Sequence, residues 1–237
     1  MSLSRDGAWP SVRAWVLQVI DRGVFPDIVM GANDGIVATA GIVEGFSATA
    51  ASGRTVILAA LASLTAGALS LGGAIYSEYS AQREAVRSTV EEERRRLAST
   101  PDLEFAQLEA MYVERGLSAE LARQVAAQLT AHDALGAHIE LEHSISTDDL
   151  TLNPVVVGVA AGLAFAGGST IPFLAALFAP PAWRLPVIFL AAIVALCLTS
   201  TFLVRVGRAS PGRTFVRALV VGVGTILVGL ALGRLIG

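Results

Sequence analysis

The sequence predicts an all-α membrane protein with five transmembrane helices and a cytoplasmic three-helix insert between the second and third of them. The chain has 237 residues, 54% of them hydrophobic, and its mean hydropathy of +0.63 is too high for an ordinary soluble domain. Five apolar segments each approach the ~20 residues that span a bilayer. The acids are segregated, because residues 78–149 hold 15 of the 20 and residues 151–237 hold none.

The apolar segments follow an N-terminal stretch, residues 1–26, which we expect to form an interfacial helix. It carries Trp9 and Trp15 but lacks the apolar core of a signal peptide. Pro154 begins the third span, where its missing N–H does no harm. The expected spans are roughly 27–48, 55–77, 152–174, 186–206 and 215–236. The chain therefore divides into residues 1–26, a first pair of spans over 27–79, the insert over 80–149, and the last three spans over 150–237.

Three helices are expected in the insert, over about 78–97, 102–115 and 118–144. The first is expected to continue directly from the second span. A run of capping and breaking residues, Ser99-Thr100-Pro101-Asp102, separates it from the second helix. Gly116 ends that second helix, and Ser118 provides an N-cap for the third. We expect these helices to form a small bundle.

Arginine placement predicts the orientation, since the cytoplasmic loops of membrane proteins carry an excess of basic residues. If the N-terminus is cytoplasmic, 14 of the 17 basic residues fall on that side. The insert is therefore expected in the cytoplasm. The single cysteine, Cys197, excludes a disulfide within the chain and a cysteine-based metal site.

Acidic residues in the first span indicate a cation path. A carboxylate such as Asp34 inside a membrane helix costs roughly 2.5–3.5 kcal/mol on insertion scales, so it is tolerated mainly where it faces a cavity, a partner or an ion. Asp27 lies seven residues earlier, on nearly the same helix face. Such carboxylates suit exchange of a proton for a metal ion. The alternative is a structural hydrogen bond to a helix end or to Asn33. Glu44, near the far end, is either an exit site or a carboxylate that reaches the outer interface.

The third insert helix carries pairs of possible metal ligands. His138 and Glu142 are spaced i,i+4, and Glu140 and His143 i,i+3, so either pair shares a helix face. Imidazole suits Fe²⁺, Mn²⁺, Co²⁺ or Zn²⁺, although such spacing is also common on solvated helices. The run 91–96, three Glu followed by three Arg, indicates a solvated face, with Glu93 as the exception.

Five motifs occur in order along nearly the whole chain. They are Met30-Gly31-Ala32-Asn33-Asp34-Gly35-Ile36-Val37, Ala66-Gly67-Ala68-Leu69-Ser70-Leu71, Ser80-Ala81-Gln82-Arg83-Glu84, Tyr112-Val113-Glu114-Arg115-Gly116-Leu117 and His132-Asp133-Ala134-Leu135-Gly136-Ala137-His138. Together they resemble signatures of the vacuolar iron transporter family. The resemblance implies five transmembrane helices, a cytoplasmic three-helix metal-binding domain and a homodimer. It also implies export of Fe²⁺ and related divalent ions from the cytosol in exchange for protons. We expect a divergent bacterial member in the inner (plasma) membrane.

Residue by residue, the resemblance implies roles for positions in both parts of the chain. Asp27 and Asp34 match the two aspartates that line the family's ion path. In the insert, the carboxylates of Glu93, Glu104 and Glu142 match metal-binding acids of the family.

Other positions depart from the family pattern. Gln107 replaces the second acid of an E-x-x-E pair, and His138 falls where some relatives have methionine. Glu78 lies one turn after a lost glutamate and is expected to substitute for it in part. Met111 is either a soft ligand or bundle core. The positions at which an expected ligand is missing are Leu71, Ile75, Val86, Thr89 and Gln107.

Three functions follow from these patterns. The first is a homodimeric, proton-coupled exporter of Fe²⁺ or Mn²⁺, with Zn²⁺ or Co²⁺ as further candidates and no permanent cofactor. The second is a non-transporting relative whose insert senses metal or binds a partner. The third, a membrane di-iron enzyme, needs two E-x-x-H motifs, and only Glu140-Leu141-Glu142-His143 supplies one. No phosphate loop, catalytic triad or basic nucleic-acid surface is evident, so we expect neither nucleotide nor nucleic acid as a partner and no enzymatic activity.

Overall fold

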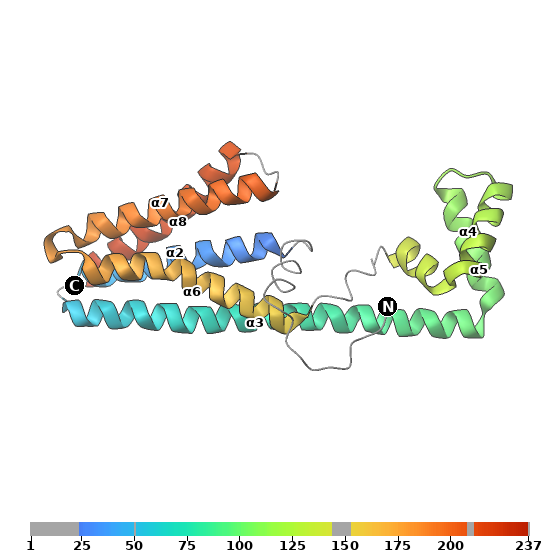
Figure 1. The fold of residues 1–237 in the computed structure, drawn as a ribbon, viewed down its shortest axis with the longest axis horizontal. Coiled ribbons are helices and arrows are strands. Elements are labelled where there is room, and N and C mark those ends of the chain that lie inside the picture. The colour runs from blue at the N-terminus through green and yellow to red at the C-terminus, as the bar shows by residue number, and fades with distance from the viewer. Residues whose placement is uncertain (1–23, 50, 144–152, 208–210, 237) are drawn as a thin grey trace. The chain divides into compact units, whose positions relative to one another are not determined.

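The computed structural model describes residues 24–49, 51–143, 153–207 and 211–236, and every long element in these ranges is a helix (Figure 1). The elements are α2 (Phe25–Ser47), α3 (Gly53–Ser99), α4 (Pro101–Glu114), α5 (Ala119–His143), α6 (Pro154–Phe178), the short 3₁₀ turn η1 (Pro181–Trp183), α7 (Arg184–Gly207) and α8 (Pro211–Ile236). The all-α prediction is confirmed for this part of the chain. The interfacial helix expected over residues 1–26 falls almost wholly outside the described residues.

Two compact units make up the chain, one from residues 1–77 and 154–237 and the other from residues 78–153. We call them the membrane unit and the insert. As predicted, the second span continues into the first insert helix, since α3 is one uninterrupted helix of 47 residues.

Four helical segments in the described residues are long and apolar enough to cross a membrane: Gly53–Ser99, Pro154–Phe178, Pro181–Phe202 and Phe215–Leu235. Helix α2 is 23 residues long, carries the polar residues Asn33, Asp34 and Glu44, and is not among these four. The chain is therefore an integral membrane protein by the length and composition of its helices. The fifth span expected over 27–48 stays a prediction.

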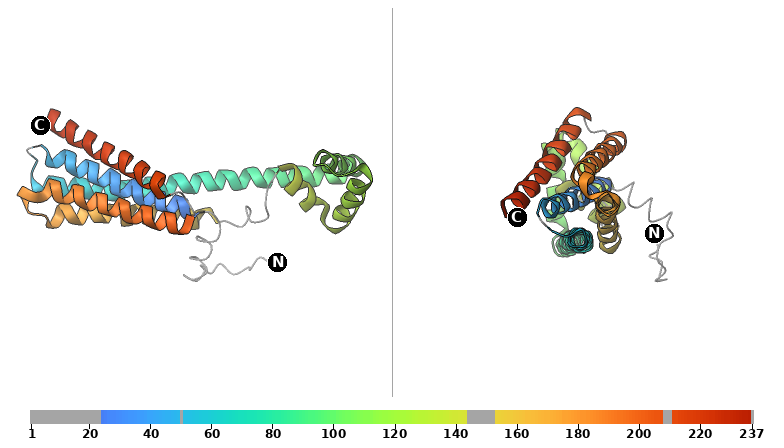
Figure 2. Two further views of the ribbon diagram at one scale, coloured as in Figure 1. Left: turned by 90° about the horizontal axis from the view of Figure 1, so that it is seen from above. Right: turned by 90° about the vertical axis from the view of Figure 1, so that its left-hand side faces the viewer.

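Helix α2 lies among the other helices of the membrane unit, as both views in Figure 2 show. Ile36, Ala40 and Val43 are fully buried on it and join a core to which α3, α6, α7 and α8 also contribute. Glycine permits the close approach of the helices: a Cβ at Gly35 would overlap the carbonyl oxygen of Phe165 on α6, and one at Gly233 on α8 would overlap that of Gly45.

Polar contacts fix α2 at two further points. The hydroxyl of Ser169 on α6 donates to the carbonyl oxygen of Gly35 over 3.1 Å. The hydroxyl of Thr199 on α7 donates to Asn33 Oδ1. Both bonds lie beside Asp34, so the segment that carries this acid is held in place from two neighbouring helices.

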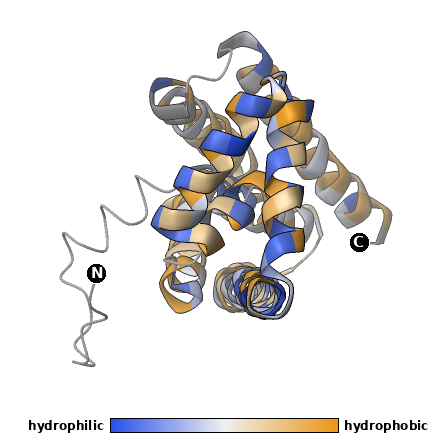
Figure 3. Cartoon of the chain, turned by 90° about the vertical axis from the view of Figure 1, so that its right-hand side faces the viewer, coloured by the Kyte–Doolittle hydropathy of each residue, from blue (hydrophilic) through white to orange (hydrophobic). Residues whose placement is uncertain are grey.

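The insert follows the expected caps. Helix α4 begins at Pro101 and ends at Glu114, two residues before Gly116, whose φ of +98° is a conformation that glycine adopts at little cost. The hydroxyl of Ser118 accepts the N–H of Leu121 over 3.4 Å at the start of α5. Figure 3 shows hydrophilic and hydrophobic residues mixed along α4 and α5, as expected of helices that pack on one face and meet water on the other.

Helix α5 differs from the single straight helix that the sequence predicts, because it is kinked at Asp133. This residue has φ −158° and ψ 86°, outside the helical range. Its Oδ1 accepts the N–H of Gly136 over 3.0 Å, which is the geometry of an N-cap. Asp133 thus ends one helical segment and starts a second, which carries His138, Glu142 and His143.

Candidate metal centre

Three side chains from three different helices meet inside the insert. They are Glu93 of α3, Glu104 of α4 and His138 of α5, and one potential ligand atom of each lies within 4.8 Å of the others. His138 Nδ1 is 3.2 Å from Glu93 Oε1 and 3.8 Å from Glu104 Oε2. We call these three residues the inner trio.

The inner trio is buried, and four of its potential ligand atoms have no hydrogen-bond partner. Glu93 and His138 are each 1% exposed and Glu104 is 3% exposed. Both carboxylate oxygens of Glu93, Glu104 Oε2 and His138 Nδ1 are buried without a hydrogen bond from the protein. Buried polar groups are nearly always paired, and leaving them unpaired is costly. Unpaired oxygen and nitrogen donors that converge on one point are what a bound cation requires.

A second set of ligands shares Glu93. Glu93, Glu142 and His143 also place one potential ligand atom each within 4.8 Å of one another, and we call them the outer trio. His143 Nε2 is 3.9 Å from Glu93 Oε2. The side chains of Glu142 and His143 are 22% and 29% exposed, so this set is closer to solvent. Glu93 therefore belongs to both trios: its Oε1 faces His138 of the inner trio, and its Oε2 faces His143 of the outer trio.

Local sequence explains how the ligands converge. The N-cap at Asp133 starts a new helical segment, on which His138 and Glu142 lie one turn apart. Glu104 sits in the first turn of α4, where an acid also interacts favourably with the helix dipole. The predicted His138–Glu142 pair therefore divides, with His138 in the inner trio and Glu142 in the outer one.

Burial governs the electrostatics of the site. It raises the pKa of Glu93, the neighbouring carboxylates of Glu142 and Glu104 raise that pKa further, and His138 and Arg96 lower it. A divalent cation would offset this penalty, because it compensates the carboxylates at the point where they repel one another. Two carboxylates with an imidazole suit Fe²⁺, Mn²⁺, Co²⁺ and Zn²⁺, whereas Ca²⁺ and Mg²⁺ prefer oxygen ligands alone.

Some residues that the sequence suggested as metal ligands belong to neither trio. Gln107 and Met111 follow Glu104 on α4 and are half-buried, and Glu140 is exposed. Arg96 was not expected at the site, whereas His143 was a candidate ligand because of its spacing from Glu140. Helical spacing paired His143 with Glu140, whereas in the structure His143 lies beside Glu93 of α3. Arg96 looked like part of a solvated run, yet it approaches both Glu93 and Glu142.

The described acids of the membrane unit do not converge in a cluster. Asp34 is exposed on α2 and Asp27, near the start of that helix, is half-buried. Asn33 accepts its hydrogen bond from Thr199, and among the described residues no hydrogen bond joins Asn33 to Asp34. Glu44 is only 2% exposed and its Oε1 lacks a hydrogen bond, so the carboxylate does not extend to the surface of the unit. Glu78, at the start of the insert, is exposed.

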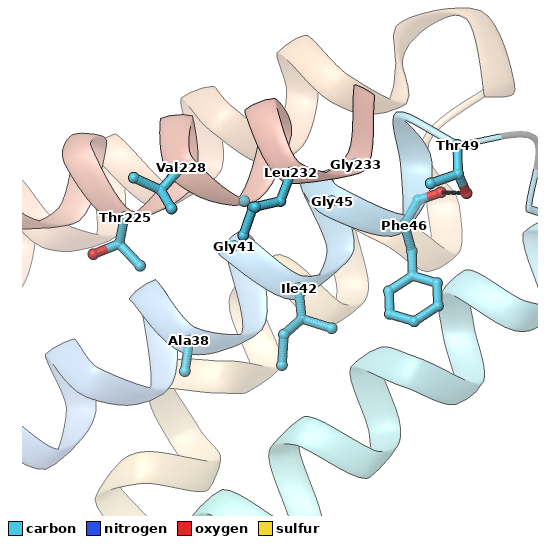
Figure 4. Close-up of a pocket in the computed structure, with 11 residues that line it drawn as sticks. Ala38, Gly41, Ile42, Gly45, Phe46, Thr49, Thr225, Val228, Leu232 and Gly233 are labelled. Atoms are coloured by element: carbon cyan, nitrogen blue, oxygen red, sulfur yellow. Dashed lines mark hydrogen bonds between the residues drawn. The ribbon is translucent and has the colours of Figure 1, made fainter. Parts of the chain in front are cut away.

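The membrane unit also has an apolar groove of about 560 Å³ between α2 and α8 (Figure 4). Its lining residues are Ala38, Gly41, Ile42, Gly45, Phe46, Thr49, Thr225, Val228, Gly229, Leu232 and Gly233. None of them offers a carboxylate or an imidazole. The Thr49 hydroxyl is already used, because it donates to the carbonyl oxygen of Phe46 over 2.8 Å. The groove is therefore not a metal site.

Known proteins match most of the chain. The vacuolar iron transporter of Acanthamoeba castellanii (strain ATCC 30010 / Neff) is 36% identical over 155 residues, which are 65% of this chain and 56% of that protein. Vacuolar iron transporter 2 of Oryza sativa subsp. japonica is 24% identical over 162 residues, 68% of this chain and 66% of the relative. The chain thus spans just over half of the first relative and just under two thirds of the second. The model of the VIT family matches residues 25–234, which include both the membrane unit and the insert, and the chain belongs to this family.

Proposed function

We propose that this protein is a membrane transporter that moves divalent metal ions, Fe²⁺ or Mn²⁺, out of the cytosol in exchange for protons. The observation that carries the proposal is the inner trio, whose buried ligand atoms converge and have no hydrogen-bond partner in the protein. Family membership supports transport, since both relatives are named as vacuolar iron transporters. Zn²⁺ and Co²⁺ suit the same donor set and are further candidates.

The proposed architecture has five spans, with α2 as the first, in a homodimer whose insert lies in the cytoplasm. The burial of Ile36, Ala40 and Val43 supports a membrane position for α2, because the other apolar helices surround it. The excess of arginine on the side of the insert supports the orientation. In a bacterial cell this membrane would be the inner one.

Each step of transport is assigned to residues already described. The insert captures the ion at Glu93, Glu104 and His138, with Glu142 and the α4 residues Gln107 and Met111 as auxiliary ligands. The ion then passes Asp27 and Asp34 on α2, with Glu78 before them and Glu44 near the far end. Because a carboxylate must be deprotonated to bind a metal, loading expels protons and release takes them up.

A second candidate is a family member that binds metal but does not transport it. At two positions where the family resemblance implies a metal ligand, this chain has an apolar side chain that packs against its neighbours. The Leu71 side chain lies against Gly31 on α2, and Ile75 is buried with 9% exposure. In this reading the insert acts as a metal sensor, and the membrane unit serves as its anchor.

Uptake into proteoliposomes distinguishes these functions. Purified protein is reconstituted, a pH gradient is imposed, and Fe²⁺ or Mn²⁺ is offered separately. We expect gradient-dependent uptake that disappears in Asp34→Asn and survives in Asp102→Asn, which makes the same change at an exposed acid of α4. If a well-folded protein takes up neither ion but still binds metal at the insert, the sensor function replaces transport.

A further inference from the structure

Besides their burial, the two trios differ in that an arginine lies beside the carboxylate oxygens of the outer one. Arg96 Nη1 is 3.9 Å from Glu93 Oε2 and 3.8 Å from Glu142 Oε1. Among the described residues, no arginine forms an ion pair with Glu104, and Glu93 Oε1 faces His138. Arg96 therefore places positive charge beside the carboxylate oxygens of the outer trio, Glu93 Oε2 and Glu142 Oε1, and forms no such pair with Glu93 Oε1 or Glu104.

A hydrogen bond to an exposed glutamate, Glu92, holds the Arg96 side chain in this position. Its Nη2 donates to Glu92 Oε1 over 2.6 Å on the exposed face of α3. Its Nη1 stays too far from Glu93 Oε2 and Glu142 Oε1 for a hydrogen bond. Glu93 Oε2 and Glu142 Oε2 have no hydrogen-bond partner. A guanidinium is always charged at physiological pH. It thus supplies positive charge to the outer trio without using the donor atoms.

The neighbouring arginine provides a contrast. Arg94 also pairs with a glutamate one turn earlier on α3, because its Nη1 lies 2.9 Å from Glu91 Oε1. Both of those side chains are 61% exposed, whereas the Arg96 side chain is 43% exposed. Among the arginines of the described ranges, Arg96 alone combines such a surface pair with approach to the buried carboxylates.

We propose that the guanidinium of Arg96 occupies the place of a second metal cation, so that the insert binds one divalent ion, at the inner trio. Glu93 would otherwise bridge two ions, since its two oxygens face the two trios. With Arg96 present, a second ion at the outer trio meets a fixed positive charge within about 4 Å of two of its ligands, which disfavours binding. The proposal rests on the proposed capture of metal by the insert, and it adds the number of ions that the insert binds.

Counting bound Mn²⁺ tests the proposal on the full chain in detergent micelles. Equilibrium dialysis gives the number of ions per chain for the native protein and for Arg96→Gln, Arg96→Lys, Arg94→Gln and Glu104→Gln. We expect Arg96→Gln to bind one more ion than the native protein. The second ion should bind at least about tenfold more tightly than in the native chain, because one nearby like charge is removed. Arg96→Lys and Arg94→Gln should keep the native number.

Electron paramagnetic resonance supplies an independent readout. Two Mn²⁺ ions bridged by Glu93 should give an exchange-coupled spectrum in Arg96→Gln and uncoupled Mn²⁺ signals in the native protein. The proposal is overturned if Arg96→Gln gains no ion, if Arg94→Gln gains one equally, or if the native protein already shows the coupled pair. If instead the inner trio does not capture metal, Glu104→Gln should bind as many ions as the native chain. That result would contradict the proposed function rather than the role of Arg96.

Discussion

The membrane unit and the insert place their acids in opposite ways. In the insert, Glu93, Glu104 and His138 converge from three helices on one buried point, and each leaves a donor atom unpaired. In the membrane unit, Asp27, Asp34 and Glu44 are spread along α2. A site that must select an ion from water needs several ligands at once, whereas a path that must release each ion benefits from single, weaker ones. The two patterns suit capture and passage.

The largest expected effect is the loss of Mn²⁺ affinity when Glu93, the ligand that both trios share, is changed. Glu93→Gln deletes the charge of the carboxylate that faces both trios. We expect the affinity of the insert for Mn²⁺ to fall more than roughly 100-fold, since changes to outer-shell partners alone cost 10–100-fold. Isothermal titration of the full chain in micelles measures the loss. Glu91→Gln, an exposed acid on the same helix, is the control and should bind as the native protein does.

A packing change in the membrane unit should leave metal capture intact. A Cβ at Gly168 on α6 would overlap the backbone of Ala32, whereas a Cβ at Gly167 would meet nothing within 4 Å. We expect Gly168→Ala to lower stability by about 1–3 kcal/mol through overpacking, and Gly167→Ala to leave it unchanged or slightly raised. Thermal unfolding in detergent compares the two variants. If Gly168→Ala also abolished Mn²⁺ binding, the two units would not be independent.

The smallest expected effect is a pH dependence of the metal-free insert. Burial raises the pKa of Glu93 above its ordinary 4.5 in the folded protein. Folding then favours the protonated acid, so this contribution to stability is full below pH 4.5 and is lost as the pH rises through the folded pKa. Hydrogen exchange of the α4 amides, corrected for intrinsic rates, should show protection that falls with rising pH. Added Mn²⁺ should remove the trend, and Glu93→Gln should lack it. A native profile that is flat, or that matches Glu93→Gln, would contradict this origin.

Much of the fold follows from the sequence, because hydropathy and caps act locally. The segment lengths, the continuation of the second span into α3, the end of α4 just before Gly116 and the cap at Ser118 were all predictable. The kink at Asp133 was not, since an aspartate is tolerated within many helices. The only signal was its position three residues before Gly136, a spacing that suits an N-cap.

The candidate site was predictable only in part. Resemblance to the family pointed to Glu93, Glu104 and Glu142, and helical spacing pointed to His138. Helical spacing describes one helix at a time, so it could not show that His138 faces Glu93 on α3 rather than Glu142. Arg96 was missed for the same reason, because a charge run on an isolated helix predicts solvent on all sides, and its approach to Glu142 depends on tertiary packing.

The bond between Asn33 and Thr199 affects how loss-of-function variants should be interpreted. Asn33 and Asp34 are adjacent, yet the first joins α2 to α7 and the second carries no hydrogen bond in the described structure. In a growth-based genetic screen, substitutions at either position would give the same phenotype. On the proposed function their origins would differ, because loss of the Asn33–Thr199 bond would reduce the amount of folded protein, whereas loss of the Asp34 carboxylate would leave abundant protein that does not transport. Protein levels must therefore accompany any phenotype assigned to this motif.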